Sequence, residues 1–453
     1  MDARSSTRKG WASRAGFVLA AAGSAIGLGN IWKFPYITGT YGGGAFVLVY
    51  LGCILLLGLP IMVAELIIGR CGQRDAIGSF LVLEGPDSRW KWVGAVSVVA
   101  AFLLLAFYSV VAGWSFDYVF KAASGEFSKG GTEQIGGLFL KLTASAFRGL
   151  FWQALFLAAT AGIVIGGIRG GIERWSKILM PALFGLLILL FLHSMFSPGG
   201  MLALRFLFTP DFSLLTPRAL LGALGHAFFT LSLGAGVMIT YGSYLDAEAD
   251  LFGLSFRIAA LDTLVALLAS LTIFSVVFSA GMPIDGGPGL VFKTLPILFL
   301  QLPFGKLLAL LFFLLLAFAA LTSAISMLEV VVAYAVDEWC WPRGRATGVV
   351  GLAAFFLGIP CGLSFNVLKG FALLPGHTVF ESLDLLVSSY MLPLGGLMVA
   401  VYVGWRWTRD RQCSAFVNLH PEGRLFAAWR FVLRYFAPAA VLIILFNEAG
   451  WLG

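Results

Sequence analysis

The sequence contains little charge. Only 12% of its 453 residues are Asp, Glu, Lys or Arg, whereas about 25% is usual for a soluble domain. These are too few ionic side chains to cover a water-exposed surface of this size, which argues against a soluble enzyme and against a disordered chain. Apolar residues make up 59% of the chain. The composition therefore predicts an all-α polytopic membrane protein surrounded by the lipid bilayer.

Cysteine, isolated basic blocks and catalytic groupings are also scarce. The five cysteines are odd in number and form no close pairs, so we expect free thiols. The net charge is +7, but no basic block stands apart from an apolar segment, so no nucleic-acid partner is expected. The sequence shows no zinc-ligand spacing, phosphate-cradling loop or defensible pair of nucleophile and base. We therefore do not expect an enzyme.

Apolar segments dominate what is present. About 20 apolar residues in a helix cross the hydrocarbon core of a bilayer. Eleven windows reach this length, near residues 14–37, 44–69, 92–120, 150–168, 175–196, 219–244, 255–281, 305–336, 347–364, 379–405 and 429–448. Because the linkers between them are short, we expect residues 1–453 to form a single transmembrane domain.

The distribution of basic residues predicts the orientation. If the N-terminus is inside, 20 of the 30 Lys and Arg fall in cytoplasmic segments and 9 in external ones, while Lys33 lies within a span. Basic residues near membrane spans favour the cytoplasmic side. We therefore expect a protein of the cell (inner) membrane with a cytoplasmic N-terminus and, after an odd number of spans, an external C-terminus.

Small and polar residues interrupt the first and sixth windows, at 23–30 and 229–236. The two breaks are five spans apart. An inverted repeat, with halves at about 11–196 and about 219–405 and an extra helix at about 429–448, would place both breaks near the midplane. Such residues also mediate close helix packing. Their matching positions favour unwound backbone around a binding site, because backbone exposed at this depth must line a cavity or bind a ligand.

Side-chain oxygens accompany the two breaks. Asn30 and Thr230 lie within them, and Asp262 lies inside the seventh window. An unpaired carboxylate at this depth is costly. A structural ion pair is the alternative, but the basic residue of this window, Arg257, stands at its cytoplasmic end. We therefore favour a bound cation, and oxygen-only ligands suit a hard cation such as sodium.

Other polar residues within the windows are less informative. Glu65, Glu329 and His226 are ionisable residues within spans. His226 is either a proton site or a neutral hydrogen-bonding residue, and the second interpretation is favoured. Thr322 and Ser323 are adjacent in the eighth window, where hydroxyls usually bond to carbonyls of their own helix.

An ordered series of motifs runs along nearly the whole chain. Its members are Trp11-Ala12-Ser13-Arg14, the first break with Ile31-Trp32-Lys33-Phe34-Pro35, Gly42-Gly43-Gly44-Ala45-Phe46, Phe228-Phe229-Thr230-Leu231-Ser232-Leu233-Gly234, Leu321-Thr322-Ser323 and Leu392-Pro393-Leu394-Gly395-Gly396. This series resembles the neurotransmitter:sodium symporters, specifically their eleven-span bacterial amino-acid members. The resemblance implies a sodium-coupled importer of neutral L-amino acids that works by alternating access.

The resemblance also implies binding sites for ions and substrate. The first sodium would be held by the substrate carboxylate with Ala25, Asn30, Thr230 and Asp262. The second sodium would be held by Gly23, Ile26, Ala319, Thr322 and Ser323. The substrate carboxylate would also meet Leu28, Gly29 and Tyr108, and its ammonium group would meet Ala25, Phe229, Thr230 and Ser232. The substrate side chain would contact Val111, Ala235, Ser326 and Met327. Relatives restricted to small substrates have a bulky aromatic residue in place of Ala235, so we expect hydrophobic or aromatic amino acids to fit.

Two gates are implied in the same way. The outer gate would pair Lys33 with Asp384 beneath a Phe229 lid. The inner gate would pair Arg8 with Asp337, supported by Trp11, Ser243 and Tyr244. Gly171 and Pro181 match a family motif that allows the fifth span to unwind when the inside opens.

Three residues depart from common family patterns. Lys33 replaces an Arg, which removes a two-pronged contact and predicts a looser gate. His226 replaces a Gln near the first sodium site. Asp262 stands where chloride-dependent members have Asn, so we expect no chloride requirement. Two alternative functions are a proton-coupled amino-acid carrier, motivated by His226, Glu65 and Asp262, and an amino-acid sensor that does not transport.

Overall fold

The computed structural model describes residues 10–128, 132–281, 289–301, 303–416, 423–448 and 450–451. Nine helices in this part of the chain are long and apolar enough to cross a membrane. They are Gly44–Gly72, Lys91–Ala123, Ala146–Ile165, Ile168–Met195, Leu251–Ser279, Gly305–Asp337, Arg343–Leu363, Val379–Arg406 and Arg424–Glu448. The protein is therefore an all-α, multi-pass membrane protein, as the composition predicts.

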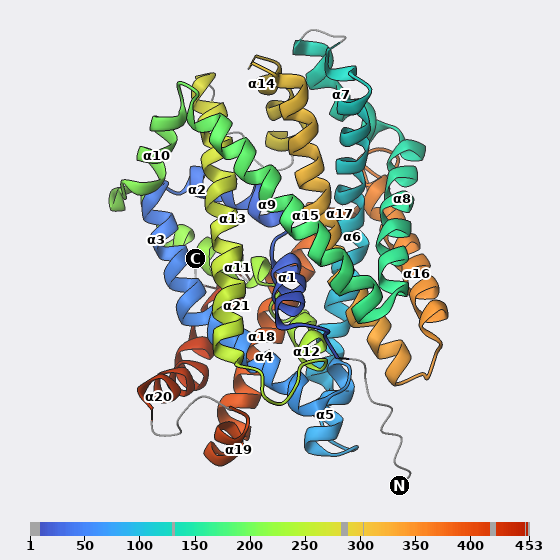
Figure 1. The fold of residues 1–453 in the computed structure, drawn as a ribbon, viewed down its shortest axis with the longest axis vertical. Coiled ribbons are helices and arrows are strands. Elements are labelled where there is room, and N and C mark those ends of the chain that lie inside the picture. The colour runs from blue at the N-terminus through green and yellow to red at the C-terminus, as the bar shows by residue number, and fades with distance from the viewer. Residues whose placement is uncertain are drawn as a thin grey trace.

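Some spans are single helices, and others consist of two helices that are labelled separately in Figure 1. The unbroken spans are α6 (Lys91–Ala123), α8 (Ala146–Ile165), α13 (Leu251–Ser279), α15 (Gly305–Asp337) and α16 (Arg343–Leu363). The fifth span ends in α9 (Arg174–Met195). The joined pairs are α3 (Gly44–Cys53) with α4 (Leu59–Gly72), α17 (Val379–Asp384) with α18 (Leu392–Val401), and α20 (Arg424–Phe431) with α21 (Ala437–Glu448).

The first and sixth windows form broken spans, as the sequence predicts. The first consists of α1 (Arg14–Ala25) and a segment, Gly29–Thr40, that contains α2 (Phe34–Thr40) and is bent by 53° from α1. The sixth consists of α11 (Pro217–Thr230) and α12 (Val237–Gly242). Together with the nine long helices, these two account for the eleven predicted windows.

Local chemistry explains the break in the sixth span. Ser232, Gly234 and Gly236 have positive φ angles of 53°, 79° and 70°, a region that favours glycine. A Cβ atom on Gly234 would lie 2.0 Å from the Leu392 carbonyl oxygen. Only glycine fits there, so α18 passes directly against the broken backbone.

Short elements cover the two ends of the helix bundle. The helices α7 (Thr132–Ala144), α10 (Gly200–Phe208) and α14 (Leu295–Gln301) lie toward one end, and α5 (Ala76–Glu84) and α19 (Arg409–Ser414) lie at the other (Figure 1). The antiparallel strands β1 (Ala372–Leu374) and β2 (His377–Thr378) form a small hairpin. The four cysteines whose side chains the structure describes are free thiols, as expected.

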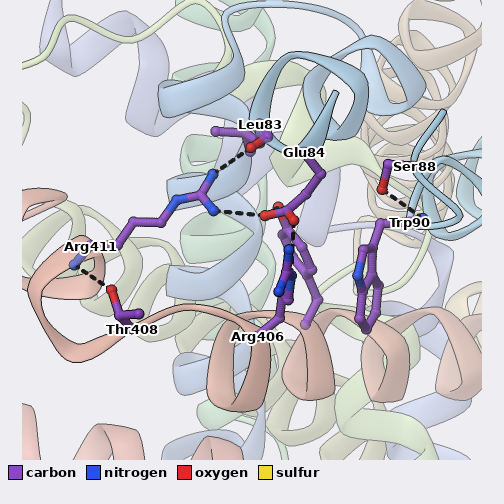
Figure 2. Close-up of polar contacts among 8 residues, drawn as sticks. Leu83, Glu84, Ser88, Trp90, Arg406, Thr408 and Arg411 are labelled. Carbon is purple, nitrogen blue, oxygen red and sulfur yellow. Dashed lines mark hydrogen bonds and ion pairs between the residues drawn. The ribbon is translucent and has the colours of Figure 1, made fainter. Parts of the chain in front are cut away.

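Glu84 anchors α5 to the end of the tenth span. Its carboxylate accepts hydrogen bonds from Arg411 Nη1 at 2.7 Å and from Arg406 Nε at 2.9 Å (Figure 2). Burial alone would raise the pKa of Glu84, but the hydrogen bonds from Arg411, Arg406 and Tyr402 hold this pKa below its usual value.

Candidate functional site

The two helix breaks face each other in the centre of the bundle. Ser232 Oγ, from the sixth span, donates a hydrogen bond to the Ser24 carbonyl oxygen of the first span at 3.1 Å. Asn30 Nδ2 donates to Thr230 Oγ1, also at 3.1 Å. The helix α1 packs against α9, α13 and α15. Residues that are some 200 positions apart in the sequence thus form one central site.

A buried cluster of oxygen-bearing side chains joins both breaks to α13. Asp262 Oδ1 accepts hydrogen bonds from Asn30 Nδ2 at 2.7 Å and from Thr230 Oγ1 at 2.9 Å. Tyr50 donates to Asp262 Oδ2 at 3.3 Å. In the described part of the chain, no Lys or Arg forms an ion pair with Asp262. The structure thus brings together the three side chains predicted for the first cation site.

A second oxygen cluster lies between α1 and α15. Ser323 Oγ is 3.4 Å from the Gly23 carbonyl oxygen and 3.3 Å from that of Ile26. Thr322 Oγ1 bonds to the Ala319 carbonyl of its own helix at 3.1 Å. A Cβ atom on Gly23 would lie 3.1 Å from Thr322 Cβ. The five residues predicted for the second site therefore meet at this contact.

A small, largely buried cavity lies beside the first cluster. Ten of the predicted substrate and ion residues line its wall: Ala25, Leu28, Gly29, Asn30, Tyr108, Phe229, Thr230, Ser232, Ser323 and Met327. Ser24, Gly27 and Leu104 complete the lining. The Leu28 amide donates to the Tyr108 hydroxyl at 3.4 Å. The Leu28 amide and the Tyr108 hydroxyl thus meet where a carboxylate is expected.

Three predicted pocket residues do not line this cavity. Val111 and Ala235 are buried outside its wall. Ser326 is instead occupied in a helix contact, 2.7 Å from the Ser24 hydroxyl. The wall on α6 is formed by Leu104, which precedes Tyr108 by one helical turn, rather than by Val111, which follows it. Helical spacing around Tyr108 fits Leu104 and Val111 equally well, so it did not show which of them borders the cavity.

Glu65 has a structural role at the second break. Its Oε1 atom accepts a hydrogen bond from the Gly234 amide at 2.7 Å. That amide belongs to the non-helical segment between α11 and α12, so it has no partner in a regular helix. The carboxylate therefore stabilises the broken backbone, a role that sequence position alone did not indicate.

The outer side of the cavity differs from the expected gate. Lys33 Nζ lies 4.4 Å from the centre of the Phe229 ring, and Asp384 accepts a hydrogen bond from Ser388 at 2.7 Å. The expected ion pair between Lys33 and Asp384 is not formed in this structure. The ammonium group instead lies over the aromatic face, an attractive arrangement in its own right. Lys33, Phe229 and Ser388 all line a vestibule on the side of the predicted outer gate.

His226 also lines this vestibule. Its ring stacks on Phe34 with centroids 5.6 Å apart and is tilted against Tyr50 at the same distance. Within the described residues, neither ring nitrogen has a hydrogen-bond partner. The prediction that His226 is a neutral hydrogen-bonding residue therefore finds no support in its contacts.

Aromatic residues pack together on the side of the predicted inner gate. Trp11 Nε1 donates to the Tyr241 carbonyl at 3.1 Å, and its ring contacts Tyr244 edge to face. Ser243 donates to the Thr240 carbonyl at 2.6 Å. Arg8, the predicted partner of Asp337, lies outside the described residues. Asp337 Oδ2 accepts a hydrogen bond from the Asp75 amide at 2.8 Å.

Glu329 lies near this inner face and has two partners. It forms an ion pair with Arg343 and accepts a hydrogen bond from the Tyr244 hydroxyl at 2.9 Å. This network connects α15 and α16 to the segment after α12. The sequence placed Glu329 within a span, but it did not indicate that Arg343 is its partner.

The start of α1 is held by the fifth span. Glu173 accepts hydrogen bonds from the Ala12 amide at 2.7 Å and from the Ser13 hydroxyl at 2.9 Å. A Cβ atom on Gly16 would lie 2.1 Å from Glu173 Oε1. Gly171 lies two residues before Glu173, and Pro181 lies inside α9. The predicted unwinding motif therefore borders a contact between the fifth span and the first.

Paired broken helices around buried oxygen clusters define a membrane transporter of the secondary, ion-coupled class. A family model described as the sodium:neurotransmitter symporter family matches residues 8–132 and 140–450. The chain belongs to the sodium:neurotransmitter symporter family. It is thus a sodium-dependent transporter and not an enzyme.

Similar proteins span the full chain. The sodium-dependent transporter YhdH of Bacillus subtilis is 43% identical, with 97% of each chain covered. A sodium-dependent transporter of Haemophilus influenzae is 33% identical, covering 99% of this chain and all of the other. A crystal structure of MhsT in complex with L-phenylalanine matches with a TM-score of 0.90 and 46% identity, over 98% of this chain and 100% of MhsT.

Proposed function

We propose that this protein is a sodium-coupled symporter that imports neutral, hydrophobic or aromatic L-amino acids by alternating access. The observation that carries the proposal is the Asp262 carboxylate, which is buried among Asn30, Thr230 and Tyr50 without a basic partner in the described residues. A sodium ion would neutralise this charge. The ligands would be Asp262, Asn30, Thr230, the Ala25 carbonyl and the substrate carboxylate.

The second sodium would bind between α1 and α15. Carbonyls of Gly23, Ile26 and Ala319 and the hydroxyls of Thr322 and Ser323 would supply five oxygens, a donor set that suits a hard cation. The position of the Ser323 hydroxyl, within 3.4 Å of the Gly23 and Ile26 carbonyl oxygens, supports this proposal. An ion there would hold the mobile first span against α15.

The substrate would lie in the cavity with its carboxylate at the Leu28 and Gly29 amides and the Tyr108 hydroxyl. Its ammonium group would meet the carbonyls of Ala25, Phe229 and Thr230 and the Ser232 hydroxyl. Leu104 and Met327 offer an apolar wall, and Met adapts readily to aromatic rings. The similarity to MhsT, crystallised with L-phenylalanine, supports a large apolar substrate.

The proposed coupling supplies ample energy. A potential of 100 mV provides about 2.3 kcal/mol for each sodium ion, and a tenfold sodium gradient provides about 1.4 kcal/mol more. Two ions together supply about 7 kcal/mol, which corresponds to roughly a 10⁵-fold gradient of a neutral amino acid. Sodium alone therefore suffices as the driving ion, and the charge of Asp262 would remove any need for chloride.

We further propose a cytoplasmic N-terminus and an external C-terminus, from the basic residues. In this orientation the vestibule beside Lys33 and Phe229 opens outward and the aromatic seal at Trp11 faces inward. The gate residues Lys33, Asp384, Arg8 and Asp337 would meet during parts of the transport cycle. The present contacts of Lys33 with Phe229 describe one state of that cycle.

Binding of radiolabelled amino acids to purified protein, each with and without sodium, tests the proposal. We expect sodium-dependent binding of Phe, Trp, Tyr, Leu or Met and no binding of Asp or Lys. Uptake into liposomes with sodium replaced by choline at fixed pH separates this function from proton coupling, the alternative that His226, Glu65 and Asp262 motivate. Counterflow in the same liposomes separates a transporter from a sensor, because a sensor exchanges no substrate across the membrane.

A further inference from the structure

Two arginines in the last span have no acidic partner among the residues that the structure describes. Arg430 and Arg434 are one helical turn apart near the start of the Arg424–Glu448 span. Among the described residues, neither forms an ion pair, and the buried Nε atom of each has no hydrogen-bond partner. Arg406 and Arg411, by contrast, are both bound by Glu84 (Figure 2). In the described part of the chain, no carboxylate therefore occupies the guanidinium groups of Arg430 and Arg434.

The tenth span fixes the position of Arg434. The guanidinium carbon of Arg434 lies 4.7 Å from the centre of the Trp405 ring, and Trp405 Nε1 donates to the Arg434 carbonyl at 2.8 Å. A Cβ atom on Gly404 would lie 3.1 Å from the Leu433 carbonyl oxygen. The small Gly404 thus permits the close approach that places Arg434 on the indole ring. This arrangement restricts the guanidinium before any ligand binds.

The surroundings of the two arginines are those of a membrane interface. Trp405, Phe431 and Tyr435 are 53%, 60% and 50% exposed, and aromatic residues are enriched at the headgroup level of bilayers. The surface farther along α21 carries the exposed apolar residues Leu442 and Ile443. A ligand that fits this surface has a negative headgroup that pairs with the arginines and long apolar chains that contact α21.

We propose that Arg430, Arg434, Trp405 and Tyr435 form a binding site for the phosphate headgroup of an anionic phospholipid. The planar guanidinium offers parallel donors that match phosphate oxygens. The aromatic rings lie at the headgroup level, and the acyl chains extend over α21. Basic surfaces between transmembrane helices suit anionic headgroups for this reason. In the proposed orientation the site faces the cytoplasmic leaflet.

Native mass spectrometry of the full-length protein, with defined lipid added, tests the site. We expect wild type to retain dioleoyl phosphatidylglycerol in preference to dioleoyl phosphatidylcholine. Arg430→Gln should reduce the affinity for phosphatidylglycerol about tenfold, since one charge-assisted contact is lost. Arg434→Lys keeps the charge but loses the parallel donors, so an intermediate loss is expected. Glycerol 1-phosphate should not displace the lipid, because it lacks acyl chains.

Arg424→Gln is the matched control. Arg424 is exposed and lies in the same helix, six positions before Arg430. At 3.6 residues per turn, its side chain therefore points in a different direction around the helix axis from that of Arg430. Its replacement removes the same charge and should leave lipid retention unchanged. An equal loss in Arg424→Gln would show general attraction between charges, and equal retention of both lipids by wild type would likewise overturn the site. Displacement by glycerol 1-phosphate would indicate a site for soluble phosphate compounds instead.

Discussion

Asn30 and Asp262 are 232 positions apart in the sequence, yet Asn30 Nδ2 lies 2.7 Å from Asp262 Oδ1. Thr230 donates to the same carboxylate oxygen at 2.9 Å. One carboxylate in α13 therefore contacts the broken segments of both repeats. A cation bound at this oxygen would stabilise both breaks together, and loss of the negative charge would affect both.

Asp262→Asn should weaken sodium binding. The amide keeps most of the shape but removes the negative charge. We expect the sodium concentration for half-maximal substrate binding to rise at least about tenfold, which is about 1.4 kcal/mol. Sodium titrations of L-phenylalanine binding measure this change. Wild-type uptake should be unaffected when chloride is replaced by gluconate.

Ser270→Ala serves as the control for this change. Ser270 lies two turns farther along α13, and its hydroxyl bonds to the Ala266 carbonyl at 2.8 Å within that helix. Its removal should leave the sodium titration as in wild type. An unchanged titration in folded Asp262→Asn would refute the role of Asp262, and loss of wild-type uptake in gluconate would refute chloride independence.

Glu173→Gln should open the inner side of the transporter. Glu173 holds the Ala12 amide and the Ser13 hydroxyl, and these contacts fix the start of α1 only while it is packed on the fifth span. Weakening them should shift the population toward inward-open states. Gly16→Ala should act in the same direction, because the new Cβ atom would occupy the position of the Glu173 carboxylate.

The measurement is thiol labelling of Ala333→Cys in a variant without the native cysteines. Ala333 is buried and lines a second cavity, which it shares with Tyr244, Asp337 and Arg343 on the side of the predicted inner gate. We expect roughly a tenfold faster reaction after loss of one charge-assisted hydrogen bond. Ser194→Ala, at the far end of α9, is the control. Labelling that stays at the wild-type rate in both test variants would show that Glu173 does not restrain α1.

The sequence was sufficient to predict the spans and their two breaks. Span length follows directly from bilayer thickness, and the residues at 23–30 and 229–236 are poor helix formers at matching places in the two halves. The oxygen cluster around Asp262 was also predictable, because Asn30, Thr230 and Asp262 are polar residues in apolar windows. In the structure these oxygens meet through hydrogen bonds from Asn30, Thr230 and Tyr50 to Asp262.

Contacts set by helix rotation and side-chain conformation were harder to predict. Leu104 and Val111 are both about one turn from Tyr108, and only the packed structure shows which turn borders the cavity. Lys33 can pair with the Asp384 carboxylate or lie over the Phe229 ring, and the sequence does not show which of these contacts forms. The contact of Glu65 with Gly234 depends on how α4 passes the second break.

Acidification should stabilise the protein through Asp75. Burial and the nearby Glu338 carboxylate raise the pKa of Asp75 to about 6, above the value near 4 of an unfolded chain. The folded state therefore binds more protons between these values, so this contribution to stability increases as the pH falls through about 6. Asp75→Asn keeps the helix cap that Asp75 gives to Ile77 and Gly78.

Thermal unfolding in detergent at pH 8 and at pH 6 checks this prediction. Asp75→Asn should unfold at a higher temperature than wild type at pH 8, and the difference should shrink at pH 6. Asp87→Asn is the control, because Asp87 is exposed in the loop after α5. If Asp75→Asn destabilises the protein equally at both pH values, the side chain acts as a cap alone and its titration contributes nothing.

Substrate size should be controlled by Leu104. Leu104 and Met327 line the cavity near Tyr108 and Phe229, and Leu104→Phe adds volume to a wall where overpacking typically costs about 1–3 kcal/mol. We expect binding of Trp and Phe to weaken at least tenfold, while Ala and Gly still bind, because only large side chains need this space. Competition between labelled and unlabelled amino acids in saturating sodium measures the change.

Leu103→Phe makes the same replacement outside the cavity wall and should leave the order of preference unaltered. Equal weakening for all substrates in Leu104→Phe would mean that the substrate side chain lies elsewhere.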